Sequence, residues 1–193
     1  MSSWLKRMLG MSAPRVVCGI PVVLHNTRDD ISDAEVLDRL RESLELIARY
    51  APRRLRHFQR DVRAIRVERF PTRGAFLPQE QVVLTELTFL ARRDISAAPV
   101  ASSILHEGVH ARVHAFRGRV MRGFPSAPDM AREERLCRRA ELAFGQSLPP
   151  ALGAPVVERA MQSLALRDRD VAPVVDWQLA RERQDAADRD TPR

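Results

Sequence analysis

The chain has 193 residues, of which 45% are hydrophobic and 30% charged, and its formal net charge is +7. This length and composition suit one globular domain, or one domain plus a tail, and do not indicate a chain that is disordered overall. Basic and acidic residues alternate along the whole sequence, so no basic tail is indicated. No apolar run is long enough to span a membrane, and Arg15 interrupts the only stretch that resembles a signal-peptide core. We therefore expect no membrane association and, by default, a cytoplasmic location.

The first half of the chain predicts a small sheet and one long helix. Residues 1–14 are expected to form a loose leader. Apolar residues at helical spacing predict a helix at 31–50, opened by a capping box of Ser32 and Glu35. Pro52 ends that helix, and a short further helix can follow at 53–59. Strands are predicted at 16–24, where Pro21 breaks or bulges the strand, and at 62–67 and 81–87, the last two joined by a turn around 71–74.

The second half predicts helices alone. Ser96 is a candidate N-cap, with Pro99 in the first turn, for a helix that runs to about Phe116. A loop at 118–128 then precedes a helix that ends near Ser147. Pro and Gly residues predict a hinge at 149–155, before further helices at 156–166 and 174–187.

The motif that carries chemistry is His106-Glu107-Gly108-Val109-His110, an HExxH sequence inside the predicted helix. Residues four apart share a helix face, so both imidazoles can bind one metal ion. Glu107 beside them can accept a proton from metal-bound water, whose pKa zinc lowers toward about 7. The competing interpretation is a helix surface with two incidental histidines, but the mid-helix position and the preceding apolar Ile104 and Leu105 favour a zinc site.

A zinc site needs a third protein ligand and an open position. The pattern HExxHxxGxxH is excluded, because position 113 is Val and no histidine follows His114. The downstream helix offers glutamates instead, and Glu134 is the favoured ligand because the small residue Cys137 lets the two helices approach closely. Glu141 remains the alternative, either as the ligand or as a residue that orients a histidine.

Together, HEGVHARV and the later ERLCRRAELAF resemble the gluzincin pattern, over roughly residues 30–148. The preceding helix and strands resemble minigluzincins and immunity-repressor-cleaving metallopeptidases. The resemblance implies that His106, His110 and Glu134 bind zinc and that Glu107 is the base. It also implies an edge strand that binds a peptide by strand addition, for which 81–87 is the candidate. Phe144-Gly145 departs from the "FA" ending that is common in these relatives.

Three other features have two interpretations each. His114 is either an oxyanion donor or partner of the site, or an exposed histidine at a helix end. Cys137 is more simply a buried packing residue than a thiol that occupies the open zinc position. Arginines at 53–66 can contact nucleic acid phosphates, although a solvated basic face is the simpler interpretation.

The sequence thus predicts a compact α+β zincin-like domain at 15–150, followed by a helical segment at 151–193 that could cover the cleft as a lid. The expected function is zinc-dependent hydrolysis of peptide bonds in a peptide or protein substrate, with Glu107 and His114 as catalytic residues. The alternatives are a metal-binding protein without hydrolytic activity, and a nucleic-acid-associated protein with an incidental HExxH.

Overall fold

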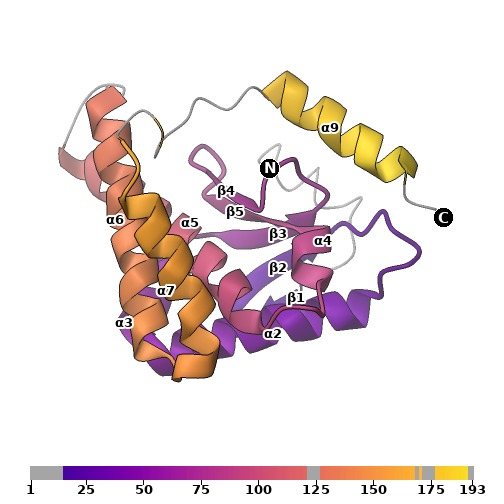
Figure 1. The fold of residues 1–193 in the computed structure, drawn as a ribbon, viewed down its shortest axis with the longest axis horizontal. Helices are drawn as coiled ribbons and strands as arrows, with labels where there is room; N and C mark the ends of the chain where they lie inside the picture. Colours follow the sequence, from indigo (N-terminus) through magenta and orange to yellow (C-terminus); the bar gives the residue numbers. More distant parts are fainter. Residues whose placement is uncertain (1–14, 121–126, 168–169, 171–176, 191–193) are drawn as a thin grey trace, which may run out of the picture.

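A computed structural model describes residues 15–120, 127–167, 170 and 177–190 of the chain. The leader expected at 1–14 lies outside these residues. The described part combines a five-stranded mixed sheet with helices, which confirms the α+β class (Figure 1).

The sheet has a parallel centre and two antiparallel edges. Its strand order is β1-β2-β3-β5-β4; β2, β3 and β5 are parallel, and β1 and β4 pair antiparallel at the two edges. The strands are β1 (Arg15–Val17), β2 (Ile20–Leu24), β3 (Ala64–Glu68), β4 (Gly74–Leu77) and β5 (Val82–Glu86).

The single strand expected at 16–24 is wrong, because the chain turns back within it. Cys18 and Gly19 both adopt positive φ, of 48° and 74°, and join β1 to β2 in a two-residue hairpin. Such a turn needs left-handed backbone at both central residues, and the twist of that turn matches the twist of the paired strands. The apolar run alone could not reveal it, since the turn contains only one glycine.

The edge strand beside the HExxH helix was also wrongly assigned. β5, expected at this edge, lies between β3 and β4, and all five of its residues are buried. The edge is formed by β4, which begins inside the region expected to be a turn. β4 has four half-buried residues and no alternating pattern, so its sequence gave little indication of a strand.

The helices largely follow the expected positions. Ser32 occupies the N-cap of α2, but its side chain makes no capping hydrogen bond, so the expected capping box is wrong. The hinge expected at 149–155 is wrong too, since α7 runs through Gly153 and Pro155. The helices are α2 (Asp33–Tyr50), α3 (Pro52–Asp61), α4 (Leu87–Ala91), α5 (Ala97–Val120), α6 (Ala127–Ser147), α7 (Pro150–Leu164) and α9 (Trp177–Asp190).

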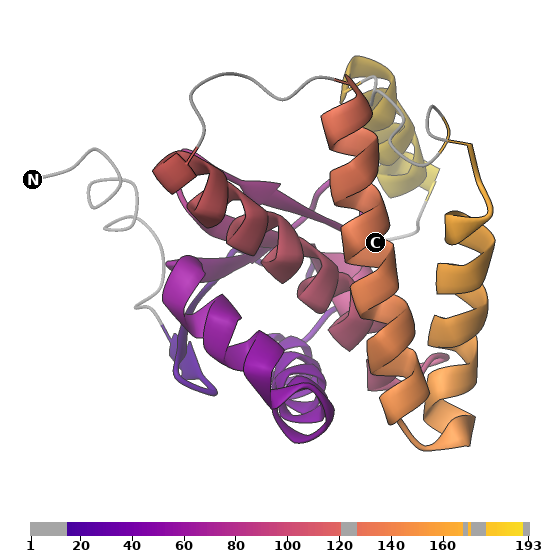
Figure 2. The same ribbon diagram turned by 90° about the vertical axis from the view of Figure 1, so that its left-hand side faces the viewer.

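The central helix is α5, which carries the HExxH motif. It contacts α2 and α3 on one side, α6 and α7 on another, and strands β4 and β5 of the sheet. Figure 2 shows α5 and α2 in front of the sheet, with α6 and α7 side by side at one end. Every described residue of α5 from Ala101 to Val109 is buried, so the motif sits in the interior. No helix in the described ranges is long and apolar enough to cross a bilayer.

Two glycines bring α6 and α7 together. A Cβ built on Gly153 would lie 2.2 Å from the backbone oxygen of Gly145, so these helices touch through their backbones. α7 therefore packs along α6 as part of the helical layer, and the lid role expected for 151–193 stays a prediction.

We expect Gly153→Ala to lower the free energy of unfolding by about 1–3 kcal/mol, because the new methyl group overpacks a backbone contact. Gly118→Ala is the matched control, since it is also helical and a Cβ there meets nothing within 4 Å. The control should be neutral or stabilising by up to about 1 kcal/mol. Urea denaturation of both variants decides the point, and equal stability would contradict the close packing.

Candidate metal centre

The two motif histidines face one another on α5. The helical spacing of four places the Nε2 atoms of His106 and His110 3.1 Å apart, with the ring centroids 4.9 Å apart. His106 is 7% exposed and Glu107 9% exposed. Both imidazoles therefore present the same nitrogen to one small space that is largely closed to solvent.

Glu134 of α6 reaches the same space. Its Oε2 lies 3.4 Å from His106 Nε2, and its Oε1 lies 3.1 Å from His110 Nε2. Donor atoms that share a tetrahedral zinc ion are separated by roughly 3.3–3.7 Å. The carboxylate of Glu134 is thus at the spacing of a third ligand.

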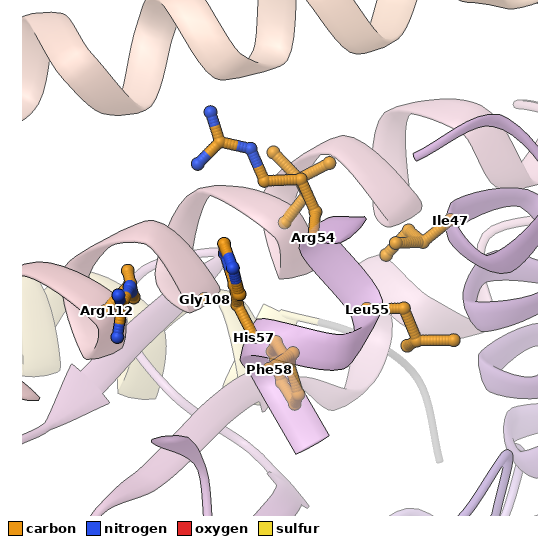
Figure 3. A pocket seen from close by; sticks show the side chains of 8 residues that line it. Ile47, Arg54, Leu55, His57, Phe58, Gly108 and Arg112 are labelled. Atoms are coloured by element: carbon orange, nitrogen blue, oxygen red, sulfur yellow. The ribbon is translucent and has the colours of Figure 1, made fainter. Parts of the chain in front are cut away.

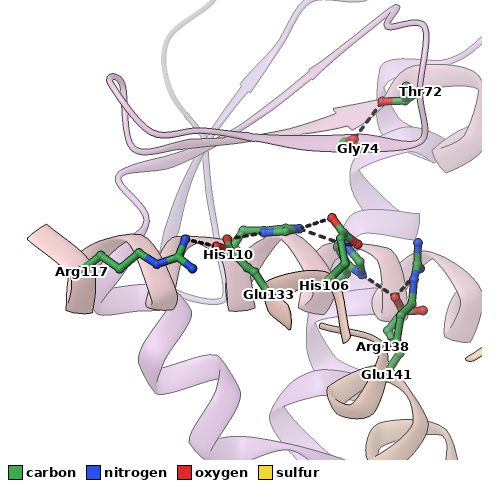
Figure 4. Close-up of polar contacts among 9 residues, drawn as sticks. Thr72, Gly74, His106, His110, Arg117, Glu133, Arg138 and Glu141 are labelled. Atoms are coloured by element: carbon green, nitrogen blue, oxygen red, sulfur yellow. Dashed lines mark hydrogen bonds and ion pairs between the residues drawn. The ribbon is translucent and has the colours of Figure 1, made fainter. Parts of the chain in front are cut away.

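The opposite nitrogens of the two imidazoles are held by other glutamates. Glu141 Oε1 lies 2.5 Å from His106 Nδ1, and Glu133 Oε1 lies 2.7 Å from His110 Nδ1. Figure 4 shows this arrangement, with α6 supplying both carboxylates. A carboxylate on the far nitrogen fixes the ring orientation and the tautomer that leaves Nε2 free to bind a metal. Glu141 therefore occupies the orienting position that the sequence offered as its second role.

These two glutamates are themselves anchored. Arg117 donates to Glu133, and Arg138 donates to Glu141 over 2.6 Å. Ser102 donates from its hydroxyl to the other oxygen of Glu141, over 3.1 Å. Both imidazoles are consequently held by carboxylates that cannot rotate freely.

Cys137 is a further donor beside the histidines. Its thiol is fully buried, and its Sγ together with one nitrogen of His106 and one of His110 lie within 4.8 Å of one another. Glu134 and Cys137 are therefore both candidates for the third ligand. The carboxylate oxygens of Glu134 lie within 3.4 Å of both Nε2 atoms. The sulfur of Cys137 is placed only within 4.8 Å of the imidazole nitrogens, so we favour Glu134.

The electrostatics of the cluster reflect its crowded charges. Burial opposes the charged form of His106, but hydrogen bonds to Glu134 and Glu141 outweigh it, so the pKa of His106 is raised. Burial likewise opposes charge on His110, whose pKa is nevertheless raised well above its usual value by Cys137, Glu133 and Glu134. Burial favours protonation of Glu134, yet the two histidines lower the pKa of its carboxyl group. The carboxylates of Glu133, Glu134 and Glu141 thus favour positive charge on the two imidazoles between them.

Glu107 points to the edge strand. A Cβ built on Gly74 of β4 would lie 3.3 Å from Glu107 Cγ and 3.4 Å from Glu107 Oε1. The carboxylate of the expected base is thus beside both the histidines and the strand edge. Thr72 donates from its hydroxyl to the carbonyl of Gly74 over 2.9 Å and helps to fix this approach (Figure 4).

The middle residue of the motif packs against α3. A Cβ on Gly108 would lie 2.5 Å from Phe58 Cδ2. Figure 3 shows the adjoining hollow on this side of α5, with His57 and Arg112 at its wall. Gly108 therefore lets α3 contact the helix that carries the histidines.

Two residues or stretches singled out from the sequence lie apart from the cluster. His114 is exposed, and its ring meets Phe76 of β4 edge-on, with 5.7 Å between centroids. The arginine stretch at 53–66 is divided between α3 and β3, and some of its charge is neutralised: Arg60 pairs with Asp61, and Arg66 with Glu80.

Sequence reasoning assigned no role to Glu133. The available signal was its position directly before Glu134, because neighbouring helical residues point about 100° apart and can serve different partners. The roles of Ser102 and Arg138 depend on the tertiary approach of α6 to α5, and no sequence signal indicated them.

Comparisons with models of protein families, with curated proteins and with solved structures found no match. The resemblance to gluzincins therefore stays a prediction that rests on the motif.

We expect Glu141→Ala to weaken metal binding by about 10- to 100-fold, because His106 loses the carboxylate that orients it. Glu133→Ala should act in the same way through His110. Glu45→Ala, an exposed carboxylate on α2, is the control that should leave affinity unchanged. Competition with a chromophoric chelator measures all three, and unchanged affinity in both site variants would contradict the orienting role.

Proposed function

We propose that this protein is a zinc-dependent metallopeptidase of zincin-like architecture. The observation that carries the proposal is the 3.1 Å approach of the Nε2 atoms of His106 and His110, with both oxygens of Glu134 at 3.1–3.4 Å from them. Two imidazoles and one carboxylate form the His₂Glu donor set of catalytic zinc sites.

The charge balance of the cluster supports a divalent cation. Glu133 pairs with Arg117, and Glu141 with Arg138. Within the described part of the chain, neither Glu107 nor Glu134 forms an ion pair with an arginine. When both imidazoles are neutral, as metal binding requires, these two carboxylates leave two negative charges uncompensated. A zinc ion would neutralise them, and buried charges are retained only when they are paired or bind a metal.

Each side chain has a defined task in hydrolysis. A bound zinc ion would polarise the scissile carbonyl and lower the pKa of water toward about 7. Glu107 accepts the proton of the attacking water and then protonates the leaving amine. Glu141 and Glu133 keep His106 and His110 in the orientation that presents Nε2. His114, near the edge strand, is a candidate for oxyanion stabilisation.

The edge strand β4 suits a peptide substrate. Glu86 donates from its backbone N–H to the carbonyl of Arg73 over 3.1 Å, which makes Arg73 and Glu86 a hydrogen-bonded pair. Along an antiparallel strand, residues that bond to the neighbouring strand alternate with residues whose backbone groups point away from it. Gly74 and Phe76 then direct their backbone N–H groups to the open edge. A peptide that paired there as an added strand would pass beside Glu107.

The decisive test is zinc content together with activity. We expect about one zinc per chain in the wild type, measured by elemental analysis, and none in His110→Ala. Loss of zinc in Glu134→Ala would identify the third ligand. Glu107→Gln should retain zinc while peptide hydrolysis falls by about 10²- to 10⁴-fold, because the general base is lost.

His114→Gln serves as the control for zinc content, since its ring lies outside the metal cluster. A wild-type protein without zinc after reconstitution would refute the proposal. Zinc bound by the wild type with no cleavage of any peptide in a diverse library would instead indicate a metal-binding protein without hydrolytic activity.

A second prediction concerns the base. Gly74→Ala should place a methyl group against Glu107 and reduce kcat by about 10- to 100-fold with zinc retained, because small displacements of a catalytic group are costly. Gly118→Ala is the control, as no atom lies near its Cβ. An unchanged kcat in Gly74→Ala would show that Glu107 is not held by the strand.

A further inference from the structure

Four side chains with possible metal-ligand atoms meet between α5 and α6, namely His106, His110, Glu134 and Cys137. Cys137 lies one helical turn after Glu134 on α6, so both side chains face α5 from the same helix. The sulfur and the imidazole nitrogens lie within 4.8 Å of one another. Donors that share a tetrahedral zinc ion lie roughly 3.3–3.7 Å apart, so the sulfur would have to move about 1 Å toward the imidazoles to bond the same ion.

The Cys137 thiol is buried beside both imidazoles. Cys137 is 0% exposed and belongs to the core between α5 and α6. A residue selected only for small size could be alanine, as at position 140 on the same helix. At position 137 the chain instead places a soft donor, of the kind that binds zinc strongly, beside two imidazoles.

We propose that Cys137 is the fourth protein ligand of the metal held by His106, His110 and Glu134, and that it closes the site in the resting protein. The inference rests on the proposed zinc site and deepens it. Four protein ligands characterise closed zinc sites, whereas three ligands and a water characterise open, catalytic ones. The thiolate therefore occupies the position that the attacking water needs.

The step that opens the site is a ligand exchange without redox chemistry. On binding the metal, the thiol of Cys137 would lose its proton to solvent. On release it would take up a proton again, and the position that it vacates would be open to water.

Cobalt(II) in place of zinc tests the proposal in the full-length protein. Visible d–d bands report that the metal is bound, and a near-ultraviolet thiolate-to-cobalt charge-transfer band reports sulfur ligation. We expect both in the wild type, and loss of only the charge-transfer band in Cys137→Ser and Cys137→Ala. Cys18→Ser, which removes the other free cysteine, is the matched control and should keep both bands.

Acetohydroxamate, which binds an open metal position, tests closure without a known substrate. The wild type should need on the order of tenfold more hydroxamate than Cys137→Ser to shift its d–d bands, equivalent to a competing bond worth about 1.4 kcal/mol. If the wild type and Cys137→Ser needed equal concentrations of hydroxamate, the proposal that Cys137 closes the site would be overturned. Bound cobalt without a charge-transfer band in the wild type would overturn the ligand assignment and leave the metallopeptidase proposal intact. Absence of any d–d band would refute the metal site itself.

Discussion

The packing of α6 against α5 is the constraint on which the candidate site depends. α5 alone supplies two imidazoles and Glu107, whereas every carboxylate that contacts those imidazoles comes from α6. Small residues make the approach possible, with Cys137 at the α5 side of α6 and the Gly145–Gly153 backbone contact securing α6 to α7. On the other side of α5, Gly108 admits Phe58 of α3. Helices packed on both sides therefore fix the position of the motif.

Burial gives this packing an electrostatic consequence. Charged groups removed from water are stable only when they are paired, and the cluster satisfies most of its charges through Arg117, Arg138 and the imidazoles. Without a metal, the raised pKa values of His106 and His110 show that protons can supply the missing positive charge. A divalent cation would replace those protons. The carboxylates that orient the histidines thus also favour a positive charge at this position.

If the proposed zinc ion binds here, its surroundings determine whether the site is catalytic. Glu107, which follows His106 on α5, lies against Gly74 of the edge strand β4, so proton transfer and peptide pairing would take place at one edge of the sheet. Cys137 of α6 places its sulfur within 4.8 Å of one nitrogen of each imidazole. In the proposed zinc site, an open and a closed form would differ by one metal–ligand bond.

The sequence by itself determined what is local in this protein. The α+β class follows from short β-branched apolar runs beside stretches of helical periodicity. The position of α5 and the pairing of its two histidines follow from periodicity within one helix, because i,i+4 spacing needs no tertiary information. Only the tertiary structure decided which glutamate faces which imidazole nitrogen. The paired residues are 23 to 35 positions apart in the sequence, so their contact depends on how α6 is rotated against α5. It also decided the hairpin at Cys18, the edge position of β4 and the continuity of α7 through Gly153. The close backbone contact between Gly153 and Gly145 shows how helix packing keeps α7 helical where Gly and Pro alone would predict a break.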